Sequence, residues 1–231
     1  MKSSLIVIFI AGCLFSAHAQ KTSIGATVQL SFPQGDYQSN YPKTGVGMRI
    51  NIMHRLNEEG PLSLGGELGY LVSGSRARYF SGYYSGYFDT YKLSASSDVF
   101  ALAFKARADL SPAERPVRFF IEATIGANLF YSSVSLQRES SFGGSQYVDG
   151  NNSKGYWSFT WGPGVGVEIP IGKKRRAGII VKGSYLCGTS TTYLTDPSID
   201  NSGNVYFTEN ESKTNMIIAE FGIRFSLSRR R

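Results

Sequence analysis

Apolar and polar residues alternate one by one through much of the chain beyond residue 21. Near the C-terminal end, Phe221, Ile223 and Phe225 share one side of this alternation. Glu220 and Arg224 share the other side. Successive side chains of a β-strand point to opposite faces, so the pattern predicts strands with one apolar and one polar face. Eight segments show it, at residues 22–32, 44–56, 62–74, 98–110, 117–134, 156–171, 178–189 and 214–227.

The connections between these segments alternate strictly between long and short. The short ones cover residues 57–61, 111–116 and 172–177, and the long ones cover residues 33–43, 75–97, 135–155 and 191–213. Short turns at one end and long loops at the other are typical of up-and-down outer-membrane barrels, whose short turns face the periplasm. A soluble sandwich or a lipocalin-like carrier also alternates, but it has no reason to keep this asymmetry.

The lengths of the segments also fit a membrane barrel. Each segment reaches the ~9–11 residues that a tilted membrane strand needs, and no later stretch approaches the ~18 apolar residues of a membrane helix. A membrane-spanning chain without such helices must satisfy its backbone hydrogen bonds between strands. We therefore predict an all-β fold, a closed antiparallel up-and-down transmembrane β-barrel of eight strands, or of ten if a long loop enters the membrane.

The N-terminal residues have the features of a secretory signal peptide. Lys2 precedes an apolar run at residues 5–15, and Ala17-His18-Ala19 forms a small-x-small cleavage site. We predict a signal peptide at residues 1–19 and a single barrel domain at residues 20–231. Residues 10–13 also resemble a lipobox, which would lipidate Cys13. The apolar run continues past Cys13, and this favours cleavage after Ala19.

The charge balance changes little when the predicted signal peptide is removed. The net charge of +7 becomes +6 because only Lys2 is lost (7 − 1 = 6). Export separates the protein from nucleic acid, so we expect no nucleic-acid partner. Cys187 becomes the single cysteine, so no disulfide can form within the chain although the compartment is oxidising. The expected location is the outer membrane of a Gram-negative cell envelope, with its lipids as partners.

Basic residues concentrate at the predicted periplasmic end. Residues 173–176 read Lys-Lys-Arg-Arg in a short turn, and residues 229–231 are three arginines. One interpretation is that they are ordinary solvated charges. A sharper hypothesis is that they contact anionic lipid headgroups, with each charge contributing ~1 kcal/mol to membrane binding.

The polar faces of the predicted strands carry both acidic and basic residues. The interior of an eight-stranded barrel is only wide enough for its own side chains, so we expect a filled lumen with mutually paired charges. Ionisable residues at membrane depth can also mark a transport path, but the pairing favours a structural network. The predicted lumen charges are Arg49, Glu67, Lys105, Arg107, Glu122, Glu168, Lys182, Glu220 and Arg224.

The sequence carries no pattern typical of an enzyme. The mature chain has one histidine, His54, at the turn end of a predicted strand and on its lipid-facing side, far from the outer leaflet. No histidine or cysteine spacing fits a metal site. Residues 162–166 read Gly-Pro-Gly-Val-Gly inside a strand with no helix after it, so they are no phosphate loop. We expect no catalysis, no metal and no cofactor, which disfavours a lipid-modifying enzyme.

The long loops are the candidate interaction surface. Residues 78–88 are rich in tyrosine, which supplies rigid amphipathic contact area for a ligand. The favoured interpretation is that the two flanking strands continue beyond the membrane as a tyrosine-rich hairpin. An extracellular or envelope protein partner would then bind through the long loops.

Two strands and the leader carry a resemblance to a known family. The strands are residues 64–70 (LGGELGY) and residues 219–225 (AEFGIRF), and the leader is the Ala19/Gln20 cleavage context. The layout resembles the small outer-membrane barrels of Bacteroidetes called PorT-like, and it is similar to the OmpA membrane domain. The resemblance covers residues 20–231. Many such barrels end on an aromatic residue, whereas residues 226–231 follow Phe225 here.

The function expected from the sequence is a structural or surface-interaction role in the outer membrane. The resemblance to PorT-like barrels implies the alternative, a transport or protein-secretion accessory role.

Overall fold

The computed structural model describes residues 22–40, 44–57, 60–84, 87–112, 115–139, 145–149, 154–172, 175–199 and 205–227. The predicted signal peptide, with cleavage after Ala19 and the alternative lipid site at Cys13, lies outside these residues. So do Lys173, Lys174 and residues 229–231.

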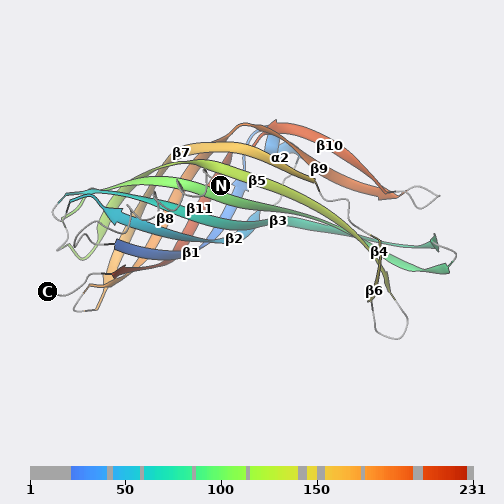
Figure 1. Ribbon diagram of the computed structural model, residues 1–231, viewed down its shortest axis with the longest axis horizontal. Coiled ribbons are helices and arrows are strands. Elements are labelled where there is room, and N and C mark those ends of the chain that lie inside the picture. The colour runs from blue at the N-terminus through green and yellow to red at the C-terminus, as the bar shows by residue number, and fades with distance from the viewer. Residues whose placement is uncertain are drawn as a thin grey trace, which may run out of the picture.

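Eight strands close into an antiparallel barrel (Figure 1). Strand β1 pairs with β11 along its whole length, and β4 pairs with β5, so the sheet has no free edge at barrel level. The predicted fold class and the predicted number of strands are therefore confirmed. The barrel strands are β1 (Thr22–Pro33), β2 (Gly45–Arg55), β3 (Leu62–Tyr84), β4 (Tyr87–Asp109), β5 (Arg118–Glu139), β7 (Lys154–Ile171), β8 (Ala177–Gly188) and β11 (Met216–Leu227).

The alternation of the sequence becomes an alternation of burial. In β1 every second residue from Ser23 to Pro33 is buried, and the residues between them face outward. Large apolar side chains thus cover the outside of the barrel. The residues that each expose more than half of their own surface include Val28, Leu68, Phe104, Val165 and Phe221. Soluble proteins rarely expose a continuous apolar surface of this kind, which marks contact with lipid or with another protein.

Three barrel strands continue beyond the barrel at the end that carries the long connections (Figure 1). Strands β3 and β4 stay paired out to Tyr84 and Tyr87, and β5 continues to Glu139 beside β4. A short strand, β6 (Ser145–Asp149), pairs with the outer part of β5. The predicted continuation of the tyrosine-rich hairpin is therefore confirmed. We call this sheet of β3, β4, β5 and β6 beyond the barrel the protruding sheet.

Two other long connections contain regular structure that the sequence pattern did not predict. Residues 191–213, expected as a loop, contain a hairpin of β9 (Ser190–Ile199) and β10 (Val205–Lys213). A short helix, α2 (Asp36–Asn40), lies in the first long connection. Figure 1 shows the β9–β10 hairpin and the protruding sheet reaching out from the same end of the barrel. Among the described residues, no helix is long and apolar enough to cross a membrane.

Candidate functional site

Six ionisable side chains from six strands form a ring inside the barrel. They alternate in sign around the wall, with three cations and three carboxylates, so the ring is neutral. We call this set the central ring. Its members, in order around the barrel, are Arg49 (β2), Glu67 (β3), Lys105 (β4), Glu122 (β5), Lys182 (β8) and Glu220 (β11).

Contacts across the first half of the central ring run from strand to strand. Arg49 Nη1 lies 2.5 Å from Glu67 Oε1, and Lys105 contacts the other oxygen of Glu67. Lys105 Nζ also lies 3.5 Å from Glu122 Oε2. These side chains are almost completely buried. Each charge therefore depends on its neighbours, because water does not reach it.

The second half of the central ring returns to the first through β1. Lys182 Nζ lies 3.0 Å from Glu122 Oε2 and 3.1 Å from Glu220 Oε1. Thr27 Oγ1 on β1 donates a hydrogen bond to Glu220 Oε2 at 3.0 Å. Gln29, also on β1, accepts a hydrogen bond from Nε of Arg49. Neutral side chains of β1 thus supply a hydrogen-bond partner to Glu220 at one end of the ring and to Arg49 at the other.

Glycine residues of strand β7 leave room for larger side chains of other strands at the level of the central ring. A Cβ atom on Gly166 would lie 2.4 Å from Cζ of Phe120, and one on Gly164 would lie 2.5 Å from the hydroxyl of Ser184. Phe120 is fully buried, and the guanidinium of Arg107 lies 3.7 Å from its ring centroid. A cation over an aromatic face is attracted by the ring, so Phe120 both fills the barrel and supports Arg107.

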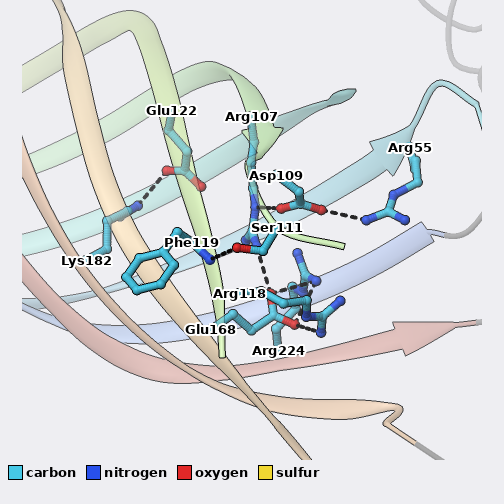
Figure 2. Close-up of polar contacts among 10 residues, drawn as sticks. All are labelled: Arg55, Arg107, Asp109, Ser111, Arg118, Phe119, Glu122, Glu168, Lys182 and Arg224. Carbon is cyan, nitrogen blue, oxygen red and sulfur yellow. Dashed lines mark hydrogen bonds and ion pairs between the residues drawn. The ribbon is translucent and has the colours of Figure 1, made fainter. Parts of the chain in front are cut away.

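A second group of charges lies at the turn end, where the short connections join the strands. Its centre is Glu168, at the end of β7, which contacts three guanidinium groups (Figure 2). Arg107 Nη2 lies 2.8 Å from Glu168 Oε2, and Arg224 Nη2 lies 2.6 Å from the same oxygen. Arg118 contacts Oε1.

Asp109, on β4, extends this group to Arg55 on β2. Arg107 Nε lies 2.8 Å from Asp109 Oδ1, and Arg55 Nη2 lies 2.5 Å from Asp109 Oδ2 (Figure 2). We call the whole group the arginine cluster. It consists of Arg55, Arg107, Asp109, Arg118, Glu168 and Arg224.

The loop end of the barrel is filled by apolar side chains. Tyr37, from helix α2, packs edge to face on Phe130, with ring centroids 5.9 Å apart, and on Tyr193 of β9, at 5.4 Å. Asn40 donates a hydrogen bond to the Tyr193 hydroxyl at 3.0 Å, which ties α2 to β9. We call this group the loop-end plug. Its members are Tyr37, Leu71, Val99, Phe130, Leu186, Tyr193, Met216 and Ile218.

Beside the plug, hydroxyl groups, most of them buried, bond to each other and to the backbone. Ser158 Oγ lies 2.8 Å from Thr214 Oγ1 and 3.2 Å from Thr189 Oγ1. Tyr193 and Ser212 share a hydrogen bond of 2.9 Å. The polar groups at this level are therefore satisfied within the protein, as buried polar groups generally are.

The structure divides the nine predicted lumen charges between two groups. All nine point inward: six form the central ring, and Arg107, Glu168 and Arg224 belong to the arginine cluster. Three members of the arginine cluster, Arg55, Asp109 and Arg118, are not among the predicted lumen charges. Each lies an even number of residues from a predicted inward charge of its own strand, and so on the same face of that strand. The alternation of the sequence could therefore have predicted all three.

Outside the lumen, the residues considered for catalysis or metal binding are the histidine His54 and any group of metal-binding side chains. His54 lies at the turn end of β2, where its Nδ1 is 3.2 Å from the hydroxyl of Thr22. Within the described part of the chain, no three histidine, cysteine, aspartate or glutamate side chains are grouped to hold a metal ion.

The protruding sheet carries its own polar contacts. Arg138 Nε donates a hydrogen bond to Asp89 Oδ2 at 2.6 Å, and the Thr90 amide donates to Asp89 Oδ1 at 2.9 Å. These hydrogen bonds hold the pKa of the Asp89 carboxyl below its usual range. Lys92 lies over the exposed ring of Tyr79, 5.6 Å from the centroid. Charged and aromatic groups therefore face solvent here.

Comparison with known proteins gives matches in structure alone. No family model matches the chain. No curated protein matches it. Its fold resembles that of a major outer membrane protein from Thermus thermophilus, with a TM-score of 0.50 and 13% identity over 91% of this chain and 100% of that chain. The chain has the fold of an outer-membrane barrel.

Two further solved structures match at lower TM-scores. One is Ail, the attachment invasion locus protein of Yersinia pestis, in complex with the heparin analogue sucrose octasulfate. Its TM-score is 0.45 and its identity 13%, over 89% of this chain and 99% of that chain. The other is Neisserial surface protein A, with a TM-score of 0.43 and 13% identity over 88% of this chain and 96% of that chain.

Proposed function

We propose that the protein is a non-enzymatic barrel of the bacterial outer membrane with a closed lumen, which acts through the surface that it presents outside the membrane. The observation that carries this proposal is the combination of an apolar outside and a charged, paired inside. A soluble barrel would bury its apolar side chains and expose its charges. Here Phe104 and Phe221 face outward while Lys105 and Glu220 are buried.

The aromatic side chains support the membrane placement. Trp157, Phe159 and Trp161 face outward near the loop end of β7, and Phe119 and Phe225 face outward near the turn end. Aromatic girdles at both interfaces are expected of membrane barrels. The short turns then face the periplasm, and the protruding sheet faces the exterior.

The filling of the barrel supports a closed lumen. The central ring and the loop-end plug occupy successive levels of the interior, and their side chains are buried almost completely. An ion or solute would have to displace paired charges at one level and packed apolar groups at the other. We therefore propose a structural or interaction role ahead of the passage of solutes.

The protruding sheet is the proposed interaction surface. It offers backbone edges together with the exposed ring of Tyr79 and the half-buried side chain of Lys92. Edge strands and tyrosine side chains are both common means of protein recognition. A partner in the envelope or outside the cell would bind there. A PorT-like accessory role in secretion is the narrower form of this proposal, in which the partner belongs to a secretion system.

One set of measurements on the full chain tests membrane insertion, orientation and closure. Purified in detergent, the protein should show heat-modifiable gel migration and little stable conductance in planar bilayers. With Cys187→Ser as background, a membrane-impermeant maleimide on whole cells should label Ser81→Cys but not Arg176→Cys. Reproducible large conductance steps would refute the closed lumen, and the reverse labelling would refute the orientation.

The interaction role has its own test. Residues 78–93 can be removed by joining Ala77 to Ser94, which lie opposite each other in the β3–β4 pairing. This shortened variant leaves the pairing of β3 with β4 at barrel level in place, so it should still insert as a barrel, as heat-modifiable migration would show. Proteins that cross-link to the full-length barrel on cells should be lost with the shortened one. An identical set of cross-linked proteins would refute recognition by the hairpin.

A further inference from the structure

The arginine cluster differs from the central ring in its charge balance. The central ring has three cations and three carboxylates, whereas the arginine cluster has four guanidinium groups and two carboxylates, a net charge of +2 (4 − 2 = 2). Buried charge is stable only when it is compensated. An excess of two positive charges among largely buried side chains therefore favours an anion beside them.

The cluster also has more hydrogen-bond donors than acceptors. Each guanidinium carries about five N–H donors, while each carboxylate offers about four acceptor sites. Glu168 already accepts from three arginines, and Asp109 accepts from two. Within the described part of the chain, the buried Nε of Arg118 has no hydrogen-bond partner. Buried donors are normally satisfied, so this atom points to an acceptor that the protein does not supply.

Access to the cluster is from the turn end. The side chains of Arg55, Arg118 and Arg224 are 16%, 11% and 11% exposed. Those of Lys105 and Lys182 in the central ring are only 2% and 3% exposed. A small solute can therefore reach the guanidinium groups from outside, and the ring closes the barrel behind them.

The surroundings strengthen the attraction for anions. Arg175 and Arg176 are exposed in the short connection that follows β7, the strand of Glu168. Like charges around the mouth of a cavity raise the local concentration of the oppositely charged ligand. The sequence of this connection, residues 172–176, contains no acidic residue, whereas Glu58, Glu59 and Glu114 belong to the other two short connections.

We propose that the arginine cluster is a binding site for a phosphate group at the turn-end mouth of the barrel. Arginine matches the tetrahedral oxyanion of phosphate because its planar fork binds two oxygens at once. The phosphate would come from solution or from a phospholipid headgroup of the adjacent leaflet. Only the second source rests on the proposed membrane placement, so a soluble ligand would bind even if that placement were wrong.

The test uses the full chain in octyl glucoside, a detergent without phosphate. Inorganic phosphate is titrated calorimetrically against chloride as the control anion. Dihexanoyl phosphatidylglycerol is added in a second arm and its retention measured by native mass spectrometry. Saturable binding of phosphate alone assigns a soluble ligand, and retention of the lipid assigns a headgroup. Absence of both up to about 10 mM, a weak affinity on the usual scale, would overturn the proposal.

Four variants separate the site from general attraction to a basic surface. Arg118→Gln and Arg224→Gln should each weaken binding by roughly tenfold or more, the size of a lost charge-assisted hydrogen bond. Arg115→Gln removes the same charge at the same end, but outside the cluster, and should leave the affinity within about twofold because its charge is screened by solvent. An equal loss in all three variants would overturn the site.

The fourth variant should strengthen phosphate binding, whereas the arginine variants weaken it. Glu168→Gln removes the competing carboxylate and should tighten phosphate binding. A merely structural role of Glu168 predicts no such gain. If Glu168→Gln does not fold, as judged by heat-modifiable migration, Asp109→Asn makes the same change at the edge of the cluster. Weaker binding in the folded variant would contradict the proposal.

Discussion

The central ring and the loop-end plug fill the same barrel with opposite chemistry. The ring joins Arg49, Glu67 and their neighbours by ion pairs, whereas the plug packs Tyr37, Phe130 and Ile218 without charges. Both exclude water almost completely. A barrel of this width can therefore be closed by either chemistry. The central ring and the loop-end plug differ in how their stability responds to substitution.

The stability of the ring depends on each charge keeping its partner, and the stability of the plug depends on the volume that its side chains fill. Removing one partner of a buried ion pair leaves an uncompensated charge. Removing a methylene group from an apolar core leaves a cavity, whose cost follows its size. Substitutions that keep the shape of a side chain should therefore be harmful in the ring and tolerated in the plug.

The largest effect is expected from Glu67, which contacts both Arg49 and Lys105. Glu67→Ala should lower the free energy of unfolding by about 3–5 kcal/mol, because two buried cations lose their common partner. Urea unfolding from lipid vesicles, followed by the fluorescence of Trp157 and Trp161, measures this loss. Glu209→Ala, in an exposed pair with Lys154, is the control and should change little. Equal losses in the two variants would show that the ring is not electrostatically closed.

A smaller effect is expected in the plug. Leu186 is almost completely buried there, and Leu186→Ala should cost about 3 kcal/mol through lost burial and a cavity. Leu186→Met keeps the volume and should cost less than about 1.5 kcal/mol. The same unfolding assay compares the two. A similar loss in both variants would mean that the plug is as intolerant of conservative change as the ring.

The next prediction removes one cation and one carboxylate of the ring together. Lys105→Met with Glu122→Leu leaves the pairs Arg49–Glu67 and Lys182–Glu220 and keeps the ring neutral. The double variant should be more stable than the sum of its single variants by about 2 kcal/mol, the coupling usual for residues in contact. Additive losses in a double-mutant cycle would indicate that the two charges act independently.

Sequence periodicity predicts the wall of the barrel better than its filling. The inward placement of Glu220 and Arg224 follows from counting residues along one strand. The loop-end plug does not follow, because Leu71, Val99 and Ile218 are apolar on the inward side of their strands, where the alternation gives no contrast. Its closure also needs Tyr37 and Tyr193, from a helix and a hairpin that lack a barrel strand's pattern.

The arginine cluster could be predicted only in part, for a different reason. Parity along β4 places Arg107 and Asp109 inside, but the grouping of Arg118 and Arg224 around Glu168 depends on the register between strands. Register is set by pairing across the whole sheet. A single sequence therefore gives the inward charges and not their partners.

The smallest effect concerns an ion pair outside the barrel, between Asp89 and Arg138 on the protruding sheet. The hydrogen bond from Arg138 lowers the pKa of the Asp89 carboxyl when the protein is folded. The stabilisation is therefore complete above the usual carboxyl pKa of about 3.9 and is lost as the pH falls through the lower, folded value. An NMR titration of the Asp89 carboxyl carbon should show this lowered pKa, and Arg138→Gln should raise it towards the usual value. Because this pair lies outside the barrel and is partly exposed to water, the variant should leave barrel unfolding unchanged at neutral pH, in contrast to Glu67→Ala. An Asp89 pKa that does not respond to Arg138→Gln would show that the pair does not hold the two strands together in solution.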